Sequence, residues 1–327
     1  MRAALYSEYG SPDVIHVEDI NRPKPANGEV LVRVRAAATN PYDWHFLRGT
    51  PYIIRLFAGL RRPRDRRLGV DLSGTVEALG PGVDTISSGK VAAGDSVFGA
   101  SPGAFGEYVA IAADRLVRVP EGVGFQEAAG ARMTGVTALQ GLRDAGRLQA
   151  EQRVLINGAS GGVGTMAVQI ARIFGAEVTA VCSARNADAV RALGAHRVID
   201  YTTTDFVADG GTFDLMFDAI GNRSIADCRS VLTRTGTYVL AGSFDDGAWL
   251  GPLRRGILIA LLSPFVSQRL LGFDAKRSTD DAALIASWLA SGEVRTVIDR
   301  TFPLDETAEA IRYLETYRAS GKVLITP

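Results

Sequence analysis

The sequence has few of the residues that build disulfide frameworks and zinc sites. Among its 327 residues are only two cysteines, Cys182 and Cys228, and three histidines, His16, His45 and His196. Two cysteines exclude a disulfide framework and a four-cysteine zinc lobe. The residues around Cys182 predict a buried strand, in which we interpret this cysteine as an inert apolar side chain.

Net charge and long apolar runs are also missing. Lys plus Arg and Asp plus Glu both number 36, so the formal charge gives no global reason to expect binding to nucleic acid or anionic membranes. The longest apolar run, 257–262, is far shorter than a membrane span, and no secretory signal pattern is visible, so we expect a cytoplasmic protein. The basic run 61–67 could meet a phosphate, but we favour a solvated loop.

The patterns along the chain indicate two domains, as the length suggests. Short strand patterns separated by Gly and Pro fill residues 1–125 and predict a compact, barrel-like domain. From 126 to 271, helical and strand patterns alternate, which predicts an α/β domain with a doubly wound parallel sheet. The tail, 272–327, has two helical patterns and a closing strand pattern.

The glycine-rich stretch after the predicted strand 153–157 is the most informative part of the chain. Gly158 is predicted to make a tight turn, Gly161 to let backbone approach a pyrophosphate, and Gly164 to let a helix pack close to the strand. The helix start offers unpaired N–H groups and a positive dipole end, and the apolar run 178–182 completes a βαβ unit. We therefore predict a dinucleotide site rather than a turn without a ligand. The predicted contacts here are Gly158, Ser160, Gly161, Gly162, Val163 and Gly164.

The end of the second strand of this unit indicates which nucleotide is bound. In NAD sites an acidic residue there bonds the adenosine ribose hydroxyls. Here the strand ends near 182–185 without a carboxylate, whereas Ser183 and Arg185 can meet a 2′-phosphate. The sequence therefore predicts NADPH; the alternative is that Arg185 is a solvated residue at a helix start.

Together these features resemble the medium-chain dehydrogenase/reductase superfamily, and within it the zinc-independent quinone oxidoreductase branch. The matching stretches are 38–43, 69–74, 94–98, 103–109, 135–141, 157–164, 200–201, 217–221 and 321–323. The resemblance covers nearly the whole chain and is strongest to the subgroup of the mitochondrial reticulon-interacting reductase and its bacterial relatives. It implies a GroES-like β-barrel domain (1–125 and 272–327), a Rossmann domain (126–271), an active site in the cleft between them, and a homodimer.

The sequence departs from the zinc-dependent members of that superfamily. Gly69-Val70-Asp71 stands where a Gly-His-Glu segment holds zinc in the related alcohol dehydrogenases, and no cysteine lies near Asn40. Zinc requires ligands of the Cys, His or carboxylate type. We therefore expect no catalytic metal.

Further cofactor contacts are implied by the resemblance alone. Tyr201 matches a position that contacts the 2′-phosphate in related reductases. Asn40 and Thr137 are expected near the nicotinamide, and Gly242 near the fifth strand. Lys322 is expected to reach the cofactor or to seal the cleft. The alternative for each is a structural role, as for an Asn before Pro, which often marks a turn.

The predicted reaction is hydride transfer from NADPH to a quinone or an α,β-unsaturated carbonyl. Negative charge then gathers on the carbonyl oxygen, where a hydrogen-bond donor stabilises it. Without zinc, the candidate donors are the Tyr52 hydroxyl, the Asn40 amide and ordered water; the alternative for Tyr52 is a wall residue. We interpret Asp43 and Asp71 as structural residues in turns. The competing functions are a reversible alcohol dehydrogenase and a non-catalytic NADPH-binding sensor.

The apolar segment 249–273 departs from the compact members of the family. It mixes Leu and Ile with Arg254, Arg255 and Arg269. We rank a flap or pocket wall over the substrate first, a subunit interface second and a membrane-surface patch third.

Overall fold

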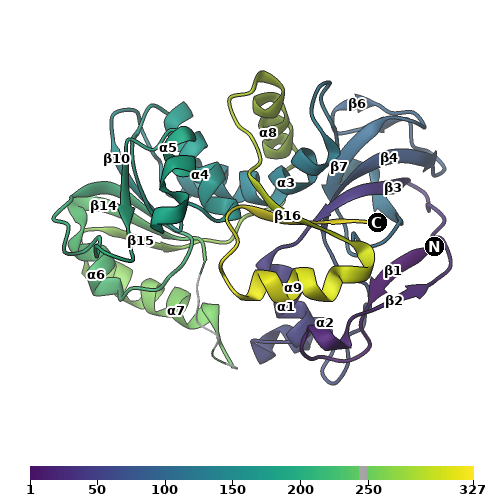
Figure 1. Ribbon diagram of the computed structural model, residues 1–327, viewed down its shortest axis with the longest axis horizontal. Coiled ribbons are helices and arrows are strands. Elements are labelled where there is room, and N and C mark those ends of the chain that lie inside the picture. The colour runs from purple at the N-terminus through teal and green to yellow at the C-terminus, as the bar shows by residue number, and fades with distance from the viewer. Residues whose placement is uncertain (243–246, 248) are drawn as a thin grey trace. The chain divides into compact units, whose positions relative to one another are not determined.

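The computed structural model describes residues 1–242, 247 and 249–327, which divide into two compact units. Unit 1 comprises Met1–Met133 and Arg277–Pro327, and unit 2 comprises Thr134–Lys276. The division falls within α3 (Phe125–Gln140), which continues into a π-helical turn, Gly141–Ala145. Figure 1 shows the elements of both units.

Unit 1 is built on a seven-stranded sheet in the order β16-β17-β3-β4-β7-β9, with β8 also paired to β3. Its strands are β1 (Arg2–Leu5), β2 (His16–Asp19), β3 (Glu29–Ala38), β4 (Asp71–Leu79), β5 (Thr85–Ile86), β6 (Gly89–Lys90), β7 (Ser96–Ala100), β8 (Tyr108–Ala112), β9 (Leu116–Arg118), β16 (Ile298–Pro303) and β17 (Lys322–Thr326). Its helices are α1 (Pro41–Arg48), α2 (Arg55–Ala58), α8 (Thr279–Ser291) and α9 (Thr307–Glu315). All pairs in this sheet are antiparallel except β16–β17. The barrel-like architecture predicted from the short strands is confirmed.

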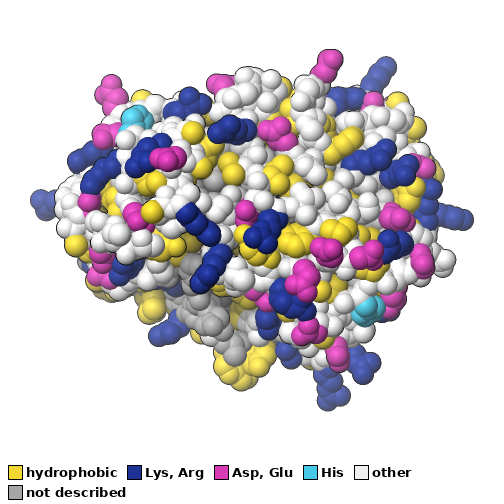
Figure 2. All heavy atoms as spheres, in the orientation of Figure 1, with side chains coloured by type: hydrophobic (Ala, Val, Ile, Leu, Met, Phe, Trp, Pro, Cys, Tyr) yellow, Lys and Arg dark blue, Asp and Glu magenta, His cyan; other side chains and the backbone are white. Residues whose placement is uncertain are grey.

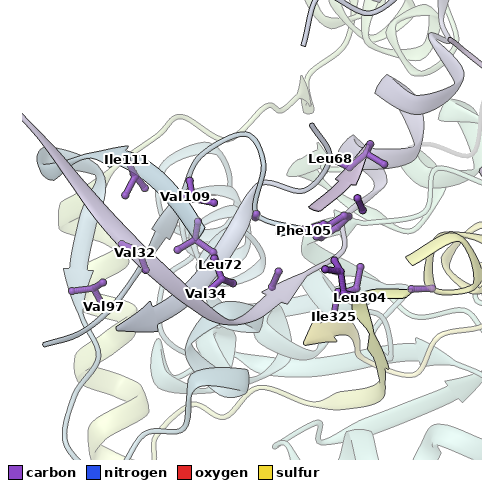
Figure 3. Packing of buried hydrophobic residues seen from close by; sticks show 14 of the residues in the cluster. Val32, Val34, Leu68, Leu72, Val97, Phe105, Val109, Ile111, Leu304 and Ile325 are labelled. Atoms are coloured by element: carbon purple, nitrogen blue, oxygen red, sulfur yellow. The ribbon is translucent and has the colours of Figure 1, made fainter. Parts of the chain in front are cut away.

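The core of unit 1 joins the two ends of the chain. In β3, Val32 and Val34 are buried while the arginines between and after them are exposed, the period-two pattern of a strand with one covered face. Leu304 and Ile325 belong to the same buried cluster as these valines (Figure 3). The C-terminal segment is therefore part of the core of unit 1, and it brings β17 beside β3.

Unit 2 is a six-stranded parallel sheet in the order β12-β11-β10-β13-β14-β15. Its strands are β10 (Arg153–Asn157), β11 (Glu177–Cys182), β12 (Arg197–Asp200), β13 (Phe213–Asp218), β14 (Leu232–Leu240) and β15 (Arg269–Gly272). Its helices are α4 (Gly162–Ile173), α5 (Ala187–Ala192), α6 (Ile225–Ser230) and α7 (Pro252–Leu262). Figure 1 shows α4 and α5 on one face of this sheet and α6 and α7 on the other. The predicted doubly wound α/β fold is confirmed.

The segment 249–273 contains two regular elements that the sequence patterns did not predict. β15 pairs with β14 and buries Leu270, so the end of the segment is a sheet strand rather than a surface piece. Four residues are too few to show a period, which is why this strand was missed. α7 buries Ile259 but leaves Leu253, Ile257 and Leu261 exposed on its outer side.

Charged side chains of both signs are interspersed over the face drawn in Figure 2, consistent with the zero net charge. Within the described part of the chain, no helix has the length and apolarity needed to cross a bilayer.

Candidate functional site

The loop between β10 and α4 has the conformation predicted from its glycines. Gly158 has a φ of +83°, which favours glycine, and a Cβ there would stand 2.5 Å from Cγ1 of Ile220. A Cβ on Gly164 would stand 2.0 Å from the carbonyl oxygen of Gly158. The helix and the loop can therefore approach this closely only because both positions lack a side chain.

Gly161 is the N-cap of α4, and its surroundings are open. A Cβ there would meet only the carbonyl oxygen of Gly158, at 3.5 Å. The backbone N–H groups of the next residues, Gly162, Val163 and Gly164, lie in the first turn, where they have no partner within the helix. Together with the half-buried Ser160, they form a cradle suited to an anion. Contact of these residues with a cofactor stays a prediction.

The sheet order places this loop at the point where a doubly wound fold binds its ligand. β10 pairs with β11 on one side and with β13 on the other. The strands that follow β10 in the chain, β11 and β12, extend the sheet on the first side, and β13 to β15 extend it on the second, so the strand order reverses between β10 and β13. Asn157 and Asp218, the last residues of β10 and β13, are neighbours in the register. Ligands of such sheets bind at this reversal, outside the carboxyl ends of the strands.

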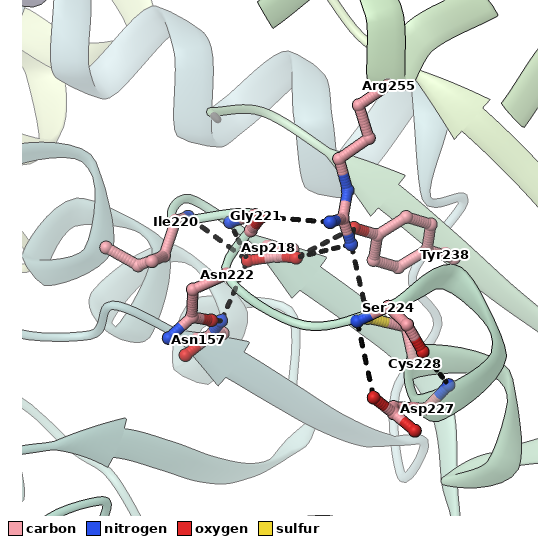
Figure 4. A network of polar contacts seen from close by, with 10 residues as sticks. All are labelled: Asn157, Asp218, Ile220, Gly221, Asn222, Ser224, Asp227, Cys228, Tyr238 and Arg255. Atoms are coloured by element: carbon pink, nitrogen blue, oxygen red, sulfur yellow. Dashed lines mark hydrogen bonds and ion pairs between the residues drawn. The ribbon is translucent and has the colours of Figure 1, made fainter. Parts of the chain in front are cut away.

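Asp218 is fully buried at that reversal and accepts four hydrogen bonds (Figure 4). Its Oδ1 accepts from Asn157 Nδ2 at 2.9 Å and from the backbone N–H groups of Ile220 and Gly221 at 3.1 and 2.8 Å. Its Oδ2 accepts from the Tyr238 hydroxyl at 2.7 Å. The carboxylate thus holds the loop after β13 in a turn, with Ile220 against Gly158.

Arg255 of α7 completes this network. Its Nη2 donates to the Tyr238 hydroxyl at 2.9 Å and its Nη1 donates to the Gly221 carbonyl at 2.9 Å, while Asp218 lies 3.9 Å away. Burial, and next the Asp218 carboxylate, raise the pKa of Tyr238, so this hydroxyl stays protonated as a donor. Sequence reasoning missed the network. The only sequence signal for this network was the family match at 217–221, which includes Asp218. Tyr238 and Arg255 gave no signal, because their sequence surroundings are those of an ordinary strand residue and an ordinary surface residue.

The residues predicted to meet a 2′-phosphate lie at the ends of β11 and β12. Ser183 follows β11, Arg185 is exposed in the next short turn, and Tyr201 follows β12 and is exposed. The structure adds Asp200, whose Oδ1 accepts from the N–H groups of Ala184 and Thr202 at 3.1 and 3.0 Å. Sequence reasoning overlooked this carboxylate because it ends the neighbouring strand, where it pairs with Cys182.

Gly242 and Thr137 also lie in unit 2. The Gly242 N–H donates to the Asp218 carbonyl at 3.2 Å, and a Cβ there would stand 2.3 Å from the Ala219 carbonyl oxygen. Gly242 therefore packs against the same loop as Gly158. Thr137 is buried on α3.

In unit 1, Asn40 is buried at the N-terminus of α1, and its side chain is fully used within the protein. Its Nδ2 donates to the Ala38 carbonyl at 3.2 Å and to Asp71 Oδ2 at 3.1 Å. Its Oδ1 accepts from Lys322 Nζ at 2.8 Å. Both amide hydrogens thus have acceptors, which leaves no spare donor for a substrate oxygen.

Lys322 lies at the centre of a buried charged cluster, which consists of Asn40, Asp43, Asp71 and Lys322. Its Nζ also donates to the Thr39 carbonyl at 2.6 Å. Burial lowers the pKa of Lys322, and the Asp71 and Asp43 carboxylates oppose that shift. Burial raises the pKa of Asp71, and it raises the pKa of Asp43 to about 7.

The prediction that Asp43 and Asp71 lie in turns is wrong. Asp71 is the first residue of β4 and pairs with Ala38, and Asp43 lies in the first turn of α1, where it accepts from the Asn40 N–H at 2.7 Å. The neighbouring Gly and Pro suggested turns, but Pro41 occupies the first position of a helix, where Pro is favoured.

Tyr52 lies outside that cluster, in a short helical turn, Tyr52–Ile54, and is 38% exposed. The guanidinium of Arg55 lies over its ring, 4.7 Å from the centroid. Among the described residues, no group of three or more His, Cys, Asp or Glu side chains is arranged to hold a metal ion.

Comparison with known proteins places this geometry in a family. Residues 26–121 match the alcohol dehydrogenase GroES-like domain, and residues 193–325 match a family described as zinc-binding dehydrogenase. The chain is 30% identical over 341 residues to the chloroplastic NADPH-dependent alkenal/one oxidoreductase of Arabidopsis thaliana, and the match covers 100% of this chain and 80% of that protein. It is 30% identical over 361 residues to the mitochondrial NAD(P)H oxidoreductase RTN4IP1 of Mus musculus, covering 99% of this chain and 89% of that one.

A solved structure agrees over the full length. The quinone oxidoreductase from Coxiella burnetii has a TM-score of 0.88 and 27% identity, and the match covers 100% of this chain and 99% of that one. The chain therefore belongs to the medium-chain dehydrogenase/reductase superfamily of oxidoreductases, in its quinone oxidoreductase branch.

Proposed function

We propose that the protein is an NADPH-dependent reductase that delivers hydride to quinones or α,β-unsaturated carbonyls without a catalytic zinc. The observation that carries the proposal is the cradle between Gly158 and Gly164 at the reversal of the parallel sheet. Relatives named as NADPH-dependent alkenal/one and quinone oxidoreductases support the substrate class and a nicotinamide cofactor.

On the cofactor side, a bound nicotinamide nucleotide supplies the hydride. The first-turn N–H groups of α4 hold its pyrophosphate, and Asp218 supports them indirectly by fixing the loop against Gly158. Ser183, Arg185 and Tyr201 take the 2′-phosphate. Because Asp200 accepts from backbone N–H groups of its own turn and of Ala184, this carboxylate acts as a cap for the turn and not as a ribose ligand.

On the acceptor side, the protein must stabilise charge on the carbonyl oxygen. Tyr52, a partly exposed residue, supplies our candidate donor through its hydroxyl. Asn40 is reassigned as a positioning residue, because both hydrogens of its amide are already bound by Ala38 and Asp71. Lys322 fixes the orientation of that amide from the other side.

The zinc-free part of the proposal depends on ligand chemistry. Val70 stands at the position of the ligand histidine and has no donor atom for zinc, and both cysteines lie in unit 2. Residues 193–325 match a family described as zinc-binding dehydrogenase, but that description does not provide the histidine and cysteine ligands that this sequence lacks. An alcohol dehydrogenase that requires zinc is therefore the weaker alternative.

The test is an assay of NADPH oxidation with a panel of quinones and enones, with and without a chelator. Turnover that survives the chelator supports the proposal. Tight NADPH binding without turnover of any acceptor would favour a sensor, and activity lost to the chelator and restored by zinc would refute the zinc-free mechanism.

The choice of nucleotide is tested with Arg185→Asp. A charged hydrogen bond to the 2′-phosphate is worth about 1.5–3 kcal/mol, so NADPH affinity should fall about 10- to 150-fold while NADH affinity changes little. Arg191→Asp is the matched control, because Arg191 is an exposed arginine of the same unit that already pairs with Asp188. Equal losses for both nucleotides, or the same loss in the control, would remove this role from Arg185.

A further inference from the structure

Four large apolar side chains are exposed in a short stretch that includes α2. They are Ile53, Leu56, Phe57 and Leu60, with exposed fractions of 37%, 59%, 76% and 67%. Single exposed apolar residues are ordinary on protein surfaces, but a contiguous group marks an interaction surface. The proposed reductase reaction uses none of these four residues.

The backbone of this stretch is held in place by hydrogen bonds. The Gly59 N–H donates to the Arg55 carbonyl at 2.9 Å, the Tyr9 hydroxyl donates to the Gly59 carbonyl at 2.6 Å, and the Arg64 N–H donates to the Ala58 carbonyl at 2.7 Å. Gly59 has a φ of +124°. The exposure of the apolar side chains is therefore a property of a defined turn.

The charges of the same stretch are of one sign. Residues 44–64 contain no Asp or Glu. Arg61, Arg62 and Arg64 are exposed, and no hydrogen bond or ion pair of their side chains is found in the described part of the chain. The arginines that follow differ, because Arg66 pairs with Glu18 at 3.1 Å and Arg67 pairs with Asp65 at 2.7 Å.

We propose that residues 53–64 form a docking surface for an anionic phospholipid membrane. The four apolar side chains would enter the boundary between headgroups and acyl chains, and the three unpaired arginines would meet lipid phosphates. An anionic phospholipid membrane attracts a protein surface that combines apolar side chains with arginines and carries no carboxylate. This proposal goes beyond the reductase function and does not depend on it.

Two other partners fit these residues less well. In a two-fold contact between copies of this chain, the three arginines would face their own equivalents with no carboxylate from 44–64 to neutralise them. A single-stranded nucleic acid would require stacking aromatics along a basic groove, whereas three of the four apolar residues here are aliphatic.

The test is sedimentation of the full chain with vesicles of phosphatidylcholine alone or with about a third phosphatidylglycerol. Each arginine near an anionic surface contributes about a fivefold gain in affinity, so R61Q/R62Q should bind the anionic vesicles about 25-fold more weakly. F57Q/L60Q should also lose binding, and R191Q/R312Q should not. That control loses the same charge, at arginines paired with Asp188 and Glu309. Thermal unfolding of each variant confirms that it is folded.

Wild-type binding that needs the anionic lipid and weakens with salt, together with the loss in both 53–64 variants, would support the proposal. No binding of the folded protein to anionic vesicles would overturn it, and so would an equal loss in R191Q/R312Q. A fall in molecular mass by sedimentation equilibrium in F57Q/L60Q, without an effect on vesicle binding, would assign the surface to a second copy instead.

Discussion

Replacing Lys322 by Met tests whether the buried charged cluster organises unit 1. Met keeps the length of the side chain but removes a cation that donates to the Thr39 carbonyl at 2.6 Å and to Asn40 Oδ1 at 2.8 Å. Two buried acceptors lose their donor, and the Asp71 and Asp43 carboxylates lose a neighbouring positive charge. Leaving one buried acceptor without its donor costs about 1–3 kcal/mol, and two acceptors are affected, so K322M should lower the free energy of unfolding by about 2–6 kcal/mol.

The assay is urea unfolding followed by tryptophan fluorescence, to which Trp44, buried in unit 1, contributes. Lys90→Met is the matched control, because Lys90 is exposed and its loss should change stability by no more than about 0.5 kcal/mol. The double variant K322M/D71N should recover about 1–3 kcal/mol relative to K322M, since it removes the charge of a buried carboxylate that has lost Lys322 and retains Arg132 as a cationic neighbour. A loss below about 1 kcal/mol in K322M, or a further loss on adding D71N, would refute the reasoning.

Three other predictions concern single residues. G164A should weaken NADPH binding and lower the free energy of unfolding by about 1–3 kcal/mol, because the new Cβ would stand 2.0 Å from a backbone oxygen. G161A should weaken only NADPH binding, because its Cβ would stand 3.5 Å from the nearest atom. Equal stabilities of the two variants in thermal unfolding would contradict this. Burial raises the pKa of Asp43 from 3.8 to about 7, so the folded chain retains a proton that the unfolded chain releases, and stability falls as pH rises through that window. D43N lacks this group, so its stability relative to wild type should rise by up to about 1.4 kcal/mol per pH unit in urea titrations from pH 5 to 7, and a constant difference would argue against it. Y52F should lower kcat/KM for a quinone by about 10- to 100-fold with unchanged NADPH affinity, and an unchanged kcat/KM would remove the donor role.

The part of the molecule that sequence patterns predicted best is the βαβ unit around Gly158. Its turn, helix start and close packing are local, and each follows from the position of a glycine. The contact between Lys322 and Asn40 could not be predicted in this way. The two residues are 282 positions apart, and only the pairing of β17 with β3 brings them together.

The network around Asp218 was missed for a similar reason. Arg255 reaches Tyr238 from a helix on the face of the sheet, and no local pattern distinguishes this arginine from the exposed Arg254 beside it. The local structure around Asp43 and Asp71 was misjudged because neighbouring Gly and Pro were taken as turn signals, although Asp71 begins a strand and Asp43 lies in the first turn of a helix.

The attachment of α7 to the sheet has a mechanical consequence. Apolar contacts alone allow a helix to shift along a sheet, but α7 is also hydrogen-bonded, because the Arg255 guanidinium donates to the Tyr238 hydroxyl and to the Gly221 carbonyl. Any displacement that withdraws this guanidinium removes a donor from the buried Tyr238 hydroxyl and from the half-buried Gly221 carbonyl, and Gly221 belongs to the turn that packs against Gly158. We therefore expect a displacement of α7 to disturb the turn after β13, which packs against Gly158.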